Sequence, residues 1–244
     1  MSPASVSGFL VNQRVLVLGG SAGLGLAVGQ AAAAEGAQVL IASSNPARVA
    51  TALPSLPPGS EGYTLDLTDE AQIQAFFAQR GTFDHLVFTA GDALHLHPLA
   101  TTELATARQA FELRYFGALA ALKYALPYLR PNGSITLTSG IAAERPVRDW
   151  AVGASICGAM ESLTRALAVE LAPVRVNAVS PGLVKTELWA DNPHRDALYA
   201  SLEQQLLVGH TAEAAEVAQT YLYLLRQTYT TGQICVVDGG YVLT

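Results

Sequence analysis

The first residues whose spacing suggests a chemical role are glycines near the start of the chain. Residues 18 to 25 read Leu-Gly-Gly-Ser-Ala-Gly-Leu-Gly, between an apolar run and an Ala-rich run. Glycine lets the backbone turn tightly, and the start of a helix offers unpaired N–H groups and a partial positive charge. The strand–turn–helix context predicts a pyrophosphate-binding turn of a dinucleotide site; a purely structural turn is the alternative. The predicted contacts are Gly19, Ser21, Ala22, Gly23, Leu24 and Gly25.

The end of the next apolar run indicates which dinucleotide is bound. It closes with Ser43, Ser44 and Asn45, and it carries no acid that would hold the ribose 2′-hydroxyl of NAD. The serines can donate to a 2′-phosphate, and Arg48 adds positive charge. These residues favour NADP(H) over NAD(H), although Arg48 can equally be an ordinary solvated helix residue.

Short β-like runs alternate with helical stretches, and this alternation predicts the elements that position the turn. Nearly continuous apolar runs are typical of strands that are covered on both faces, and β–α alternation indicates a parallel sheet. We predict strands at 14–18, 38–42, 62–65, 85–89, 134–138, 175–179 and 234–237, and helices at 25–35, 69–79, 102–129, 155–171 and 212–225. The expected fold is a single α/β domain, residues 1–244, of the Rossmann type: a doubly wound parallel sheet of about seven strands with helices on both faces. The long connection at about 187–210, which contains Trp189 and Tyr199, is expected to be a substrate lid.

Composition excludes several classes of function. The net charge of -6 and the 14% of charged residues do not resemble a nucleic-acid-binding protein. No apolar run is long enough for a membrane span, and the first twelve residues do not resemble a signal peptide. Two isolated cysteines, Cys157 and Cys235, form no disulfide framework, so we expect a cytoplasmic protein.

Four further motifs follow the glycine turn in order, and with it they resemble the short-chain dehydrogenase/reductase family. They are Leu65-Asp66-Leu67-Thr68, Thr89-Ala90-Gly91, the segment from Arg175 to Gly182 with Thr186, and Val237-Asp238-Gly239-Gly240. The resemblance implies that Asp66 and Leu67 meet the adenine and that Ala90 and Gly91 line the cofactor. It also implies that the loop with Pro181, Gly182, Val184 and Thr186 holds the nicotinamide. Members of the family are commonly homo-oligomers, so a tetramer or dimer is expected.

The residues that carry the family's chemistry are changed in this chain. In the register of the family's Tyr-x-x-x-Lys helix, the Tyr position falls on Gly153 and the Lys position on Cys157, and no Tyr lies between Tyr128 and Tyr199. The family's Asn position holds Arg114. Its Ser position falls on Gly140 in strict register, or on Ser139 if the loop differs by one residue.

These changes favour a reductase of unusual chemistry. Ketone reduction requires a proton donor for the developing alkoxide, whereas an iminium ion accepts hydride without one. Asp149 can stabilise a substrate cation, Trp150 can add a cation–π face, and Arg114 can replace the missing Lys beside the cofactor. Asp149 can instead be a surface carboxylate that pairs with Arg145 or Arg148.

Three alternatives stay open at this stage. Carbonyl reduction can persist with Asp149, Ser139 or water as the donor. The chain can bind the cofactor without redox turnover, or it can be a non-redox enzyme such as a cyclase. His95 and His97 are too few to predict a metal site, so none is expected, and Cys157 is expected to be a small core residue.

Overall fold

The chain folds around a parallel sheet of seven strands. The structure is a computed structural model and describes residues 8–92, 97–189, 193 and 195–244. The strand order is β3-β2-β1-β4-β5-β6-β9, and the two strands of every neighbouring pair run parallel. The bounds are β1 Arg14–Leu18, β2 Gln38–Ser43, β3 Glu61–Thr64, β4 Phe83–Phe88, β5 Leu129–Thr138, β6 Arg175–Pro181 and β9 Ile234–Val237. The predicted doubly wound sheet is confirmed.

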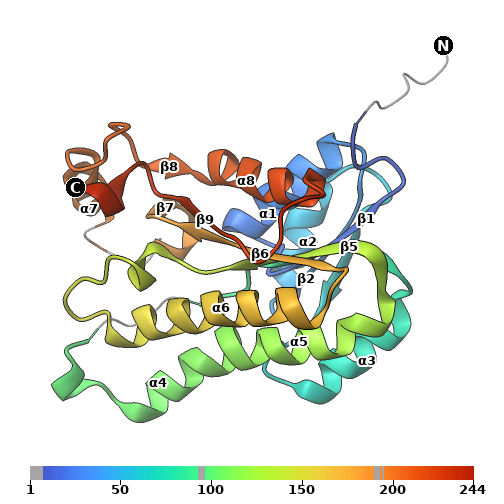
Figure 1. Ribbon diagram of the computed structural model, residues 1–244, viewed down its shortest axis with the longest axis horizontal. Coiled ribbons are helices and arrows are strands. Elements are labelled where there is room, and N and C mark those ends of the chain that lie inside the picture. Colours follow the sequence, from blue (N-terminus) through green and yellow to red (C-terminus); the bar gives the residue numbers. More distant parts are fainter. Residues whose placement is uncertain (1–7, 93–96, 190–192, 194) are drawn as a thin grey trace.

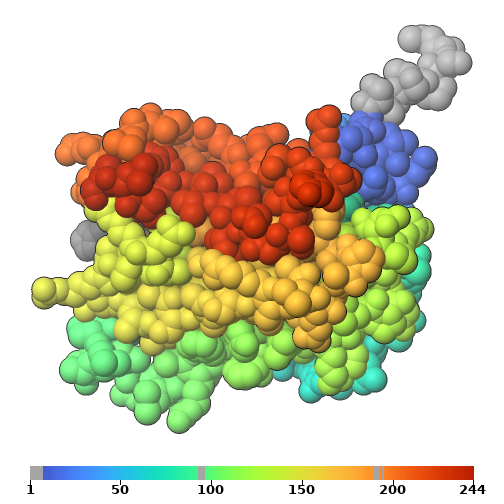
Figure 2. Space-filling view, viewed as in Figure 1, coloured from blue at the N-terminus to red at the C-terminus, as the bar shows by residue number. Residues whose placement is uncertain are grey.

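Helices cover both faces of this sheet (Figure 1). One face carries α1 (Gly23–Ala34), α2 (Pro46–Ala52) and α8 (Ala214–Arg226), and the other carries α3 (Glu70–Arg80), α5 (Gly117–Ala125) and α6 (Ala151–Glu170). Alternate residues of β1 serve the two layers: Leu16 and Leu18 pack with α3, α5 and α6, whereas Val15 and Val17 pack with α1 and α8. Figure 2 shows from the same side how side chains fill the spaces between the ribbons.

The order of the strands fixes where a ligand can bind. The chain moves outward from β1 through β2 to β3 and then returns to β4 on the other side of β1. In open α/β sheets, ligands bind beyond the carboxyl ends of the strands at such a reversal. The β1–β4 boundary is therefore the expected location, and the helix that follows β1 begins there.

The predicted helix at 102–129 is observed over a shorter range, from Leu104 to Ala125, and it contains an irregular turn. The structure has α4 (Leu104–Phe111), a π-helical turn at Glu112–Phe116, and then α5. A π turn inserts an extra residue into the helix, and such turns occur often at functional sites. A Cβ atom on Gly117 would lie 2.5 Å from the carbonyl oxygen of Leu67. Glycine at this position therefore allows the start of α5 to pack against the backbone of Leu67. Arg114 lies within this turn.

The connection after β6 has structure of its own. Within it, β7 (Val184–Lys185) pairs with β8 (Ala212–Glu213), and α7 covers Arg195–Glu203. Helix α2 was not predicted from the sequence. It begins at Pro46, and the Asn45 side chain accepts a hydrogen bond from the Arg48 backbone N–H at 3.0 Å. No helix in the described part of the chain is long and apolar enough to cross a membrane.

Candidate active site

The glycine turn is held between the ends of β1, β2 and β4. The backbone N–H groups of Gly19 and Gly20 donate to the Ala42 carbonyl at 2.8 and 3.3 Å. The Thr89 N–H donates to the Leu18 carbonyl at 2.8 Å. Gly19 has φ +89°, and a Cβ atom there would lie 2.5 Å from the Ala90 nitrogen. The turn is therefore fixed in contact with the segment that follows β4, at the reversal of strand order.

The first turn of α1 exposes backbone N–H groups. Ala22 is the N-cap residue and has no side-chain hydrogen bond to the helix. A Cβ atom on Gly25 would lie 2.2 Å from the Gly19 carbonyl oxygen, so the helix packs directly against the turn. Ser21 and Leu24 are half-buried beside it. A helix start whose own N-cap residue supplies no side-chain acceptor, next to a tight glycine turn, fits a dinucleotide pyrophosphate.

The segment that follows β6 reaches the same turn. The Gly182 N–H donates to the Val237 carbonyl at 2.9 Å, and this bond anchors Pro181-Gly182 on the end of β9. Val184 is buried in β7. A Cβ atom on Gly23 would lie 3.3 Å from the Thr186 Cβ. The structure therefore brings the predicted phosphate turn and the predicted nicotinamide clamp together.

The predicted adenine end lies beyond β2 and β3. The Leu65 N–H donates to the Ser43 carbonyl at 3.0 Å, so these two segments are adjacent. The Asp66 carboxylate accepts hydrogen bonds from the Thr68 backbone N–H at 2.9 Å and from the Thr68 hydroxyl at 2.7 Å. Leu67 is buried. Ser44 and Arg48 are exposed, which leaves both side chains accessible to a ligand.

Arg114 projects from the π turn onto the loop after β4. Its guanidinium lies against Gly91, where a Cβ atom would be 2.7 Å from the guanidinium carbon. One Nη donates to the Asp92 carbonyl, and Nε lies 3.5 Å from the Asp92 carboxylate. Burial lowers the pKa of Arg114, and the Asp92 charge partly opposes that shift. The result is a largely buried cation that is held by one acid.

Arg114, Ser139 and Cys157 line a small cavity of about 30 Å³. The Ser139 hydroxyl is directed towards α6, with the Cys157 carbonyl at 3.1 Å and the Glu161 carboxylate at 3.2 Å. Burial raises the pKa of the Cys157 thiol, which keeps it protonated and neutral. A Cβ atom on Gly140 would lie 3.2 Å from this sulfur. Cys157 was expected to be only a small core residue, but its side chain also forms part of the cavity wall. Gly153 is buried one turn earlier in α6.

Asp149 lies apart from that cavity, in an exposed turn before α6. Its φ is +71°, and the Trp150 N–H donates back to the Val147 carbonyl at 3.3 Å. Arg145 is engaged elsewhere: its guanidinium lies 4.1 Å from the centre of the Tyr241 ring and donates to the Thr244 hydroxyl at 2.8 Å. Across the described residues, Asp149 forms no ion pair with Arg145 or Arg148.

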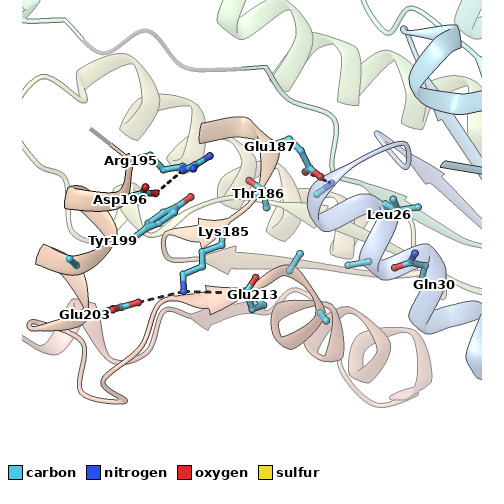
Figure 3. Close-up of a pocket in the computed structure, with 15 residues that line it drawn as sticks. Leu26, Gln30, Lys185, Thr186, Glu187, Arg195, Asp196, Tyr199, Glu203 and Glu213 are labelled. Carbon is cyan, nitrogen blue, oxygen red and sulfur yellow. Dashed lines mark hydrogen bonds and ion pairs between the residues drawn. The ribbon is translucent and has the colours of Figure 1, made fainter. Parts of the chain in front are cut away.

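A larger groove of about 870 Å³ runs from the glycine turn between α1, α7 and α8 (Figure 3). Tyr199 lines it and is nearly buried. Lys185 lies between two acids, 3.5 Å from Glu203 and 3.6 Å from Glu213. The Glu187 carboxylate, at the end nearest α1, accepts a hydrogen bond from the Gly23 N–H at 3.0 Å. Trp189 is half-buried in the same connection.

Histidines make no metal site among the described residues. His97 is exposed in the loop before α4, and His95 lies outside the part of the chain that the structure describes. In that part, no three His, Cys, Asp or Glu side chains gather as ligands would.

Two residues of the site were missed from the sequence. Asp92 pairs with Arg114, and Glu187 bonds to the glycine turn. Both follow directly after a motif residue, Gly91 and Thr186 respectively. That adjacency is a signal that could have indicated them.

Comparison with known proteins agrees with this geometry. A family model described as enoyl-(acyl carrier protein) reductase matches residues 19–242. The short-chain dehydrogenase/reductase ATR9 of Stachybotrys chlorohalonatus is 38% identical, over 93% of this chain and 96% of its own. A solved small-chain dehydrogenase in complex with NADPH is 36% identical with a TM-score of 0.85, over 95% of this chain and 99% of its own. The MalC reductase/Diels-Alderase of Malbranchea aurantiaca is 31% identical with a TM-score of 0.89, over 97% of this chain and 98% of its own.

The fold is that of a doubly wound α/β protein whose strand order reverses between β1 and β4. The chain belongs to the short-chain dehydrogenase/reductase family, as the matches along nearly its whole length show. It is therefore an oxidoreductase of this type.

Proposed function

We propose that the protein is an NADPH-dependent reductase that delivers hydride to an imine or iminium substrate. The observation that carries this proposal is that Cys157 of α6 lines the small cavity together with Arg114 and Ser139. In the register of the resemblance, Cys157 stands at the family's Lys position, and Gly153, which is buried in the same helix, stands at its Tyr position. A buried thiol of raised pKa is neither a fixed cation nor an efficient acid at neutral pH. An iminium carbon needs no acid, because hydride addition directly gives a neutral amine.

The cofactor preference rests on charge at the end of β2. Ser43, Ser44 and Arg48 supply hydroxyls and a cation there, and residues 43–48 contain no carboxylate that would repel a 2′-phosphate. The solved relative with NADPH agrees with this preference. When bound, NADPH supplies the hydride; Gly19, Gly23 and the start of α1 would hold its pyrophosphate, and Thr186 its nicotinamide end.

Arg114 takes the role of the absent lysine in this proposal. The guanidinium is held by Asp92 and faces the cavity wall formed by Ser139 and Cys157. A buried cation in this position orients the nicotinamide ribose and stays charged, because arginine remains protonated even with a lowered pKa. Its contribution is positioning rather than proton transfer.

Asp149 and Trp150 are proposed to stabilise the substrate cation. Both lie in the connection between β5 and α6, which leaves the carboxyl edge of the sheet, the edge of the proposed cofactor site (Figure 1). Asp149 is exposed and has no ion-pair partner among the described residues. A substrate ammonium or iminium group would supply the missing counter-charge.

A second candidate function is a cyclisation that accompanies or replaces reduction. The similar MalC protein is named a reductase/Diels-Alderase. Its name therefore assigns both a reduction and a cyclisation to one protein of this fold. Carbonyl reduction with Asp149, Ser139 or water as donor is the less favoured redox variant, since Ser139 is directed towards α6. Binding of the dinucleotide without turnover is the remaining alternative.

Deuterium transfer separates these functions. The purified protein is given NADPH labelled with deuterium at the transferable position together with a cyclic iminium salt. Reduction predicts an amine that is heavier by one deuterium, whereas a cyclised product without the label would support the non-redox enzyme. Labelled NADPH that binds but is never consumed across the substrate panel would favour the binding protein.

The domain organisation and the oligomeric state are also part of this proposal. We propose one catalytic domain over residues 1–244, with residues 187–210 as a lid over the substrate, in a cytoplasmic homotetramer or homodimer. Exposed apolar side chains on the layer of α4, α5 and α6 support self-association; they include Leu104, Phe116 and Val169. Light scattering of the purified protein tests the assembly.

A further inference from the structure

We propose that Glu187 occupies the pyrophosphate position of the glycine turn in the free protein, and that it thereby sets the affinity for the dinucleotide. This inference rests on the proposed cofactor site. Its starting point is the hydrogen bond from the Gly23 N–H to the Glu187 carboxylate at 3.0 Å (Figure 3). The two residues are 164 positions apart, so this contact joins the start of the proposed lid to the start of α1.

The contact has the chemistry of a phosphate contact. Gly23 is the first residue of α1, and its N–H is one of the helix-start donors that no earlier residue of the helix can satisfy. Ala22, the N-cap residue, offers no side-chain acceptor. A carboxylate at this point satisfies the donor and meets the positive end of the helix dipole, as a phosphate oxygen would.

The carboxylate and the pyrophosphate cannot both occupy this position. A Cβ atom on Gly23 would lie 3.6 Å from the Glu187 Oε2, and 3.3 Å from the Thr186 Cβ. Two anions competing for one N–H in so narrow a space repel each other, so bound dinucleotide must displace Glu187. Glu187 is exposed, and its side chain can move into solvent while Thr186 stays beside the turn.

Three other acids line the groove, and two of them provide matched comparisons. Glu203 and Glu213 both pair with Lys185, whereas Asp196 pairs with Arg195. Removing the charge of Glu213 changes the field of the groove without freeing a donor of the glycine turn. Glu187 is the acid of this groove that contacts the turn.

The test measures dinucleotide affinity by isothermal titration for the full chain and for Glu187→Ala, Glu187→Gln and Glu213→Gln. Loss of the competing hydrogen bond predicts about three- to tenfold tighter binding for Glu187→Ala, a smaller gain for Glu187→Gln, and no gain for Glu213→Gln. NADPH and NADH should gain equally, because both carry the pyrophosphate. A larger gain for NADPH, or an equal gain in Glu213→Gln, would mean a general charge effect and would overturn the proposal.

Thermal unfolding gives a readout that is independent of activity. Without cofactor, Glu187→Ala should unfold at a lower temperature than the parent, because α1 loses the acid at its N-terminus. With saturating NADPH this deficit should disappear, since the pyrophosphate then occupies the same donors. A deficit that persists in the saturated protein would assign Glu187 a purely structural role. Parent protein that binds neither dinucleotide would overturn the cofactor site and this inference together, whereas normal binding with unchanged affinity in Glu187→Ala would overturn the inference alone.

Discussion

Two glycines of α1, one turn apart, should respond oppositely to the same substitution. A Cβ atom on Gly25 would lie 2.2 Å from the Gly19 carbonyl oxygen and 2.4 Å from the Thr89 hydroxyl. A Cβ atom on Gly29 would meet the Val39 side chain at 3.4 Å, which is an ordinary contact. Alanine therefore fits at position 29 and collides at position 25.

The magnitudes follow from these contacts. In a helix interior, glycine is less favourable than alanine by about 0.5–1 kcal/mol, so Gly29→Ala should raise the free energy of unfolding by about that amount. Gly25→Ala has the same propensity gain, but overpacking costs about 1–3 kcal/mol. Since the turn backbone must move at position 25, we expect a net loss of about 1–2 kcal/mol there.

Cofactor binding should be weakened by Gly25→Ala and unaffected by Gly29→Ala. The atoms that must yield to a methyl group at position 25 belong to the phosphate turn and to the end of β4, so NADPH affinity should fall by more than about tenfold, or ~1.4 kcal/mol. Gly29→Ala should bind as the parent does. Urea unfolding and fluorescence titration with NADPH measure both effects. Unchanged stability and affinity in Gly25→Ala, or an equal loss in Gly29→Ala, would refute the packing of α1 on the turn.

Three further predictions concern charge. Asp149→Asn should reduce turnover at least tenfold, or more than ~1.4 kcal/mol, while the loop keeps its shape, because Asn also tolerates the φ of +71°; near-normal kinetics would make Asp149 an ordinary surface acid. Ser44→Asp should weaken NADPH binding by about tenfold through repulsion of the 2′-phosphate and leave NADH binding unweakened, as parallel titrations would show. Burial, and to a smaller extent the positive charge of Arg175, lowers the pKa of His85 from 6.5 to about 4. Between these two pH values, His85 is protonated in the unfolded chain and neutral in the folded chain. Stability should therefore fall as pH drops from 6.5 towards 4, by up to about 3 kcal/mol, and urea unfolding of His85→Gln should show a flatter pH profile than the parent.

The sheet and the glycine turn were predictable because their signals are local. β1 and β2 read as apolar runs that match their observed bounds closely, and the turn is marked by glycine spacing between a strand and a helix. Chain order then fixed the parallel topology through the rules of β–α–β connections.

The contacts that shape the site were not predictable in this way. Arg114 meets Asp92 across 22 residues, and Glu187 meets Gly23 across 164; no periodicity links such positions. The π turn at Glu112–Phe116 also leaves no mark, because the apolar spacing on either side is helical. The direction of the Ser139 hydroxyl depends on where α6 packs, which only the folded chain determines.

The most direct test of the proposed chemistry compares matched substrates. The purified protein is assayed for NADPH oxidation with a cyclic iminium salt and with the ketone of the same carbon skeleton, with NADH in parallel. The proposed chemistry predicts turnover of the iminium salt with NADPH and a kcat/KM for the ketone that is lower by orders of magnitude, because neither Gly153 nor Cys157 can protonate an alkoxide. Ketone reduction at an equal or higher rate would contradict the account, since another group would then be supplying the proton that Gly153 and Cys157 cannot.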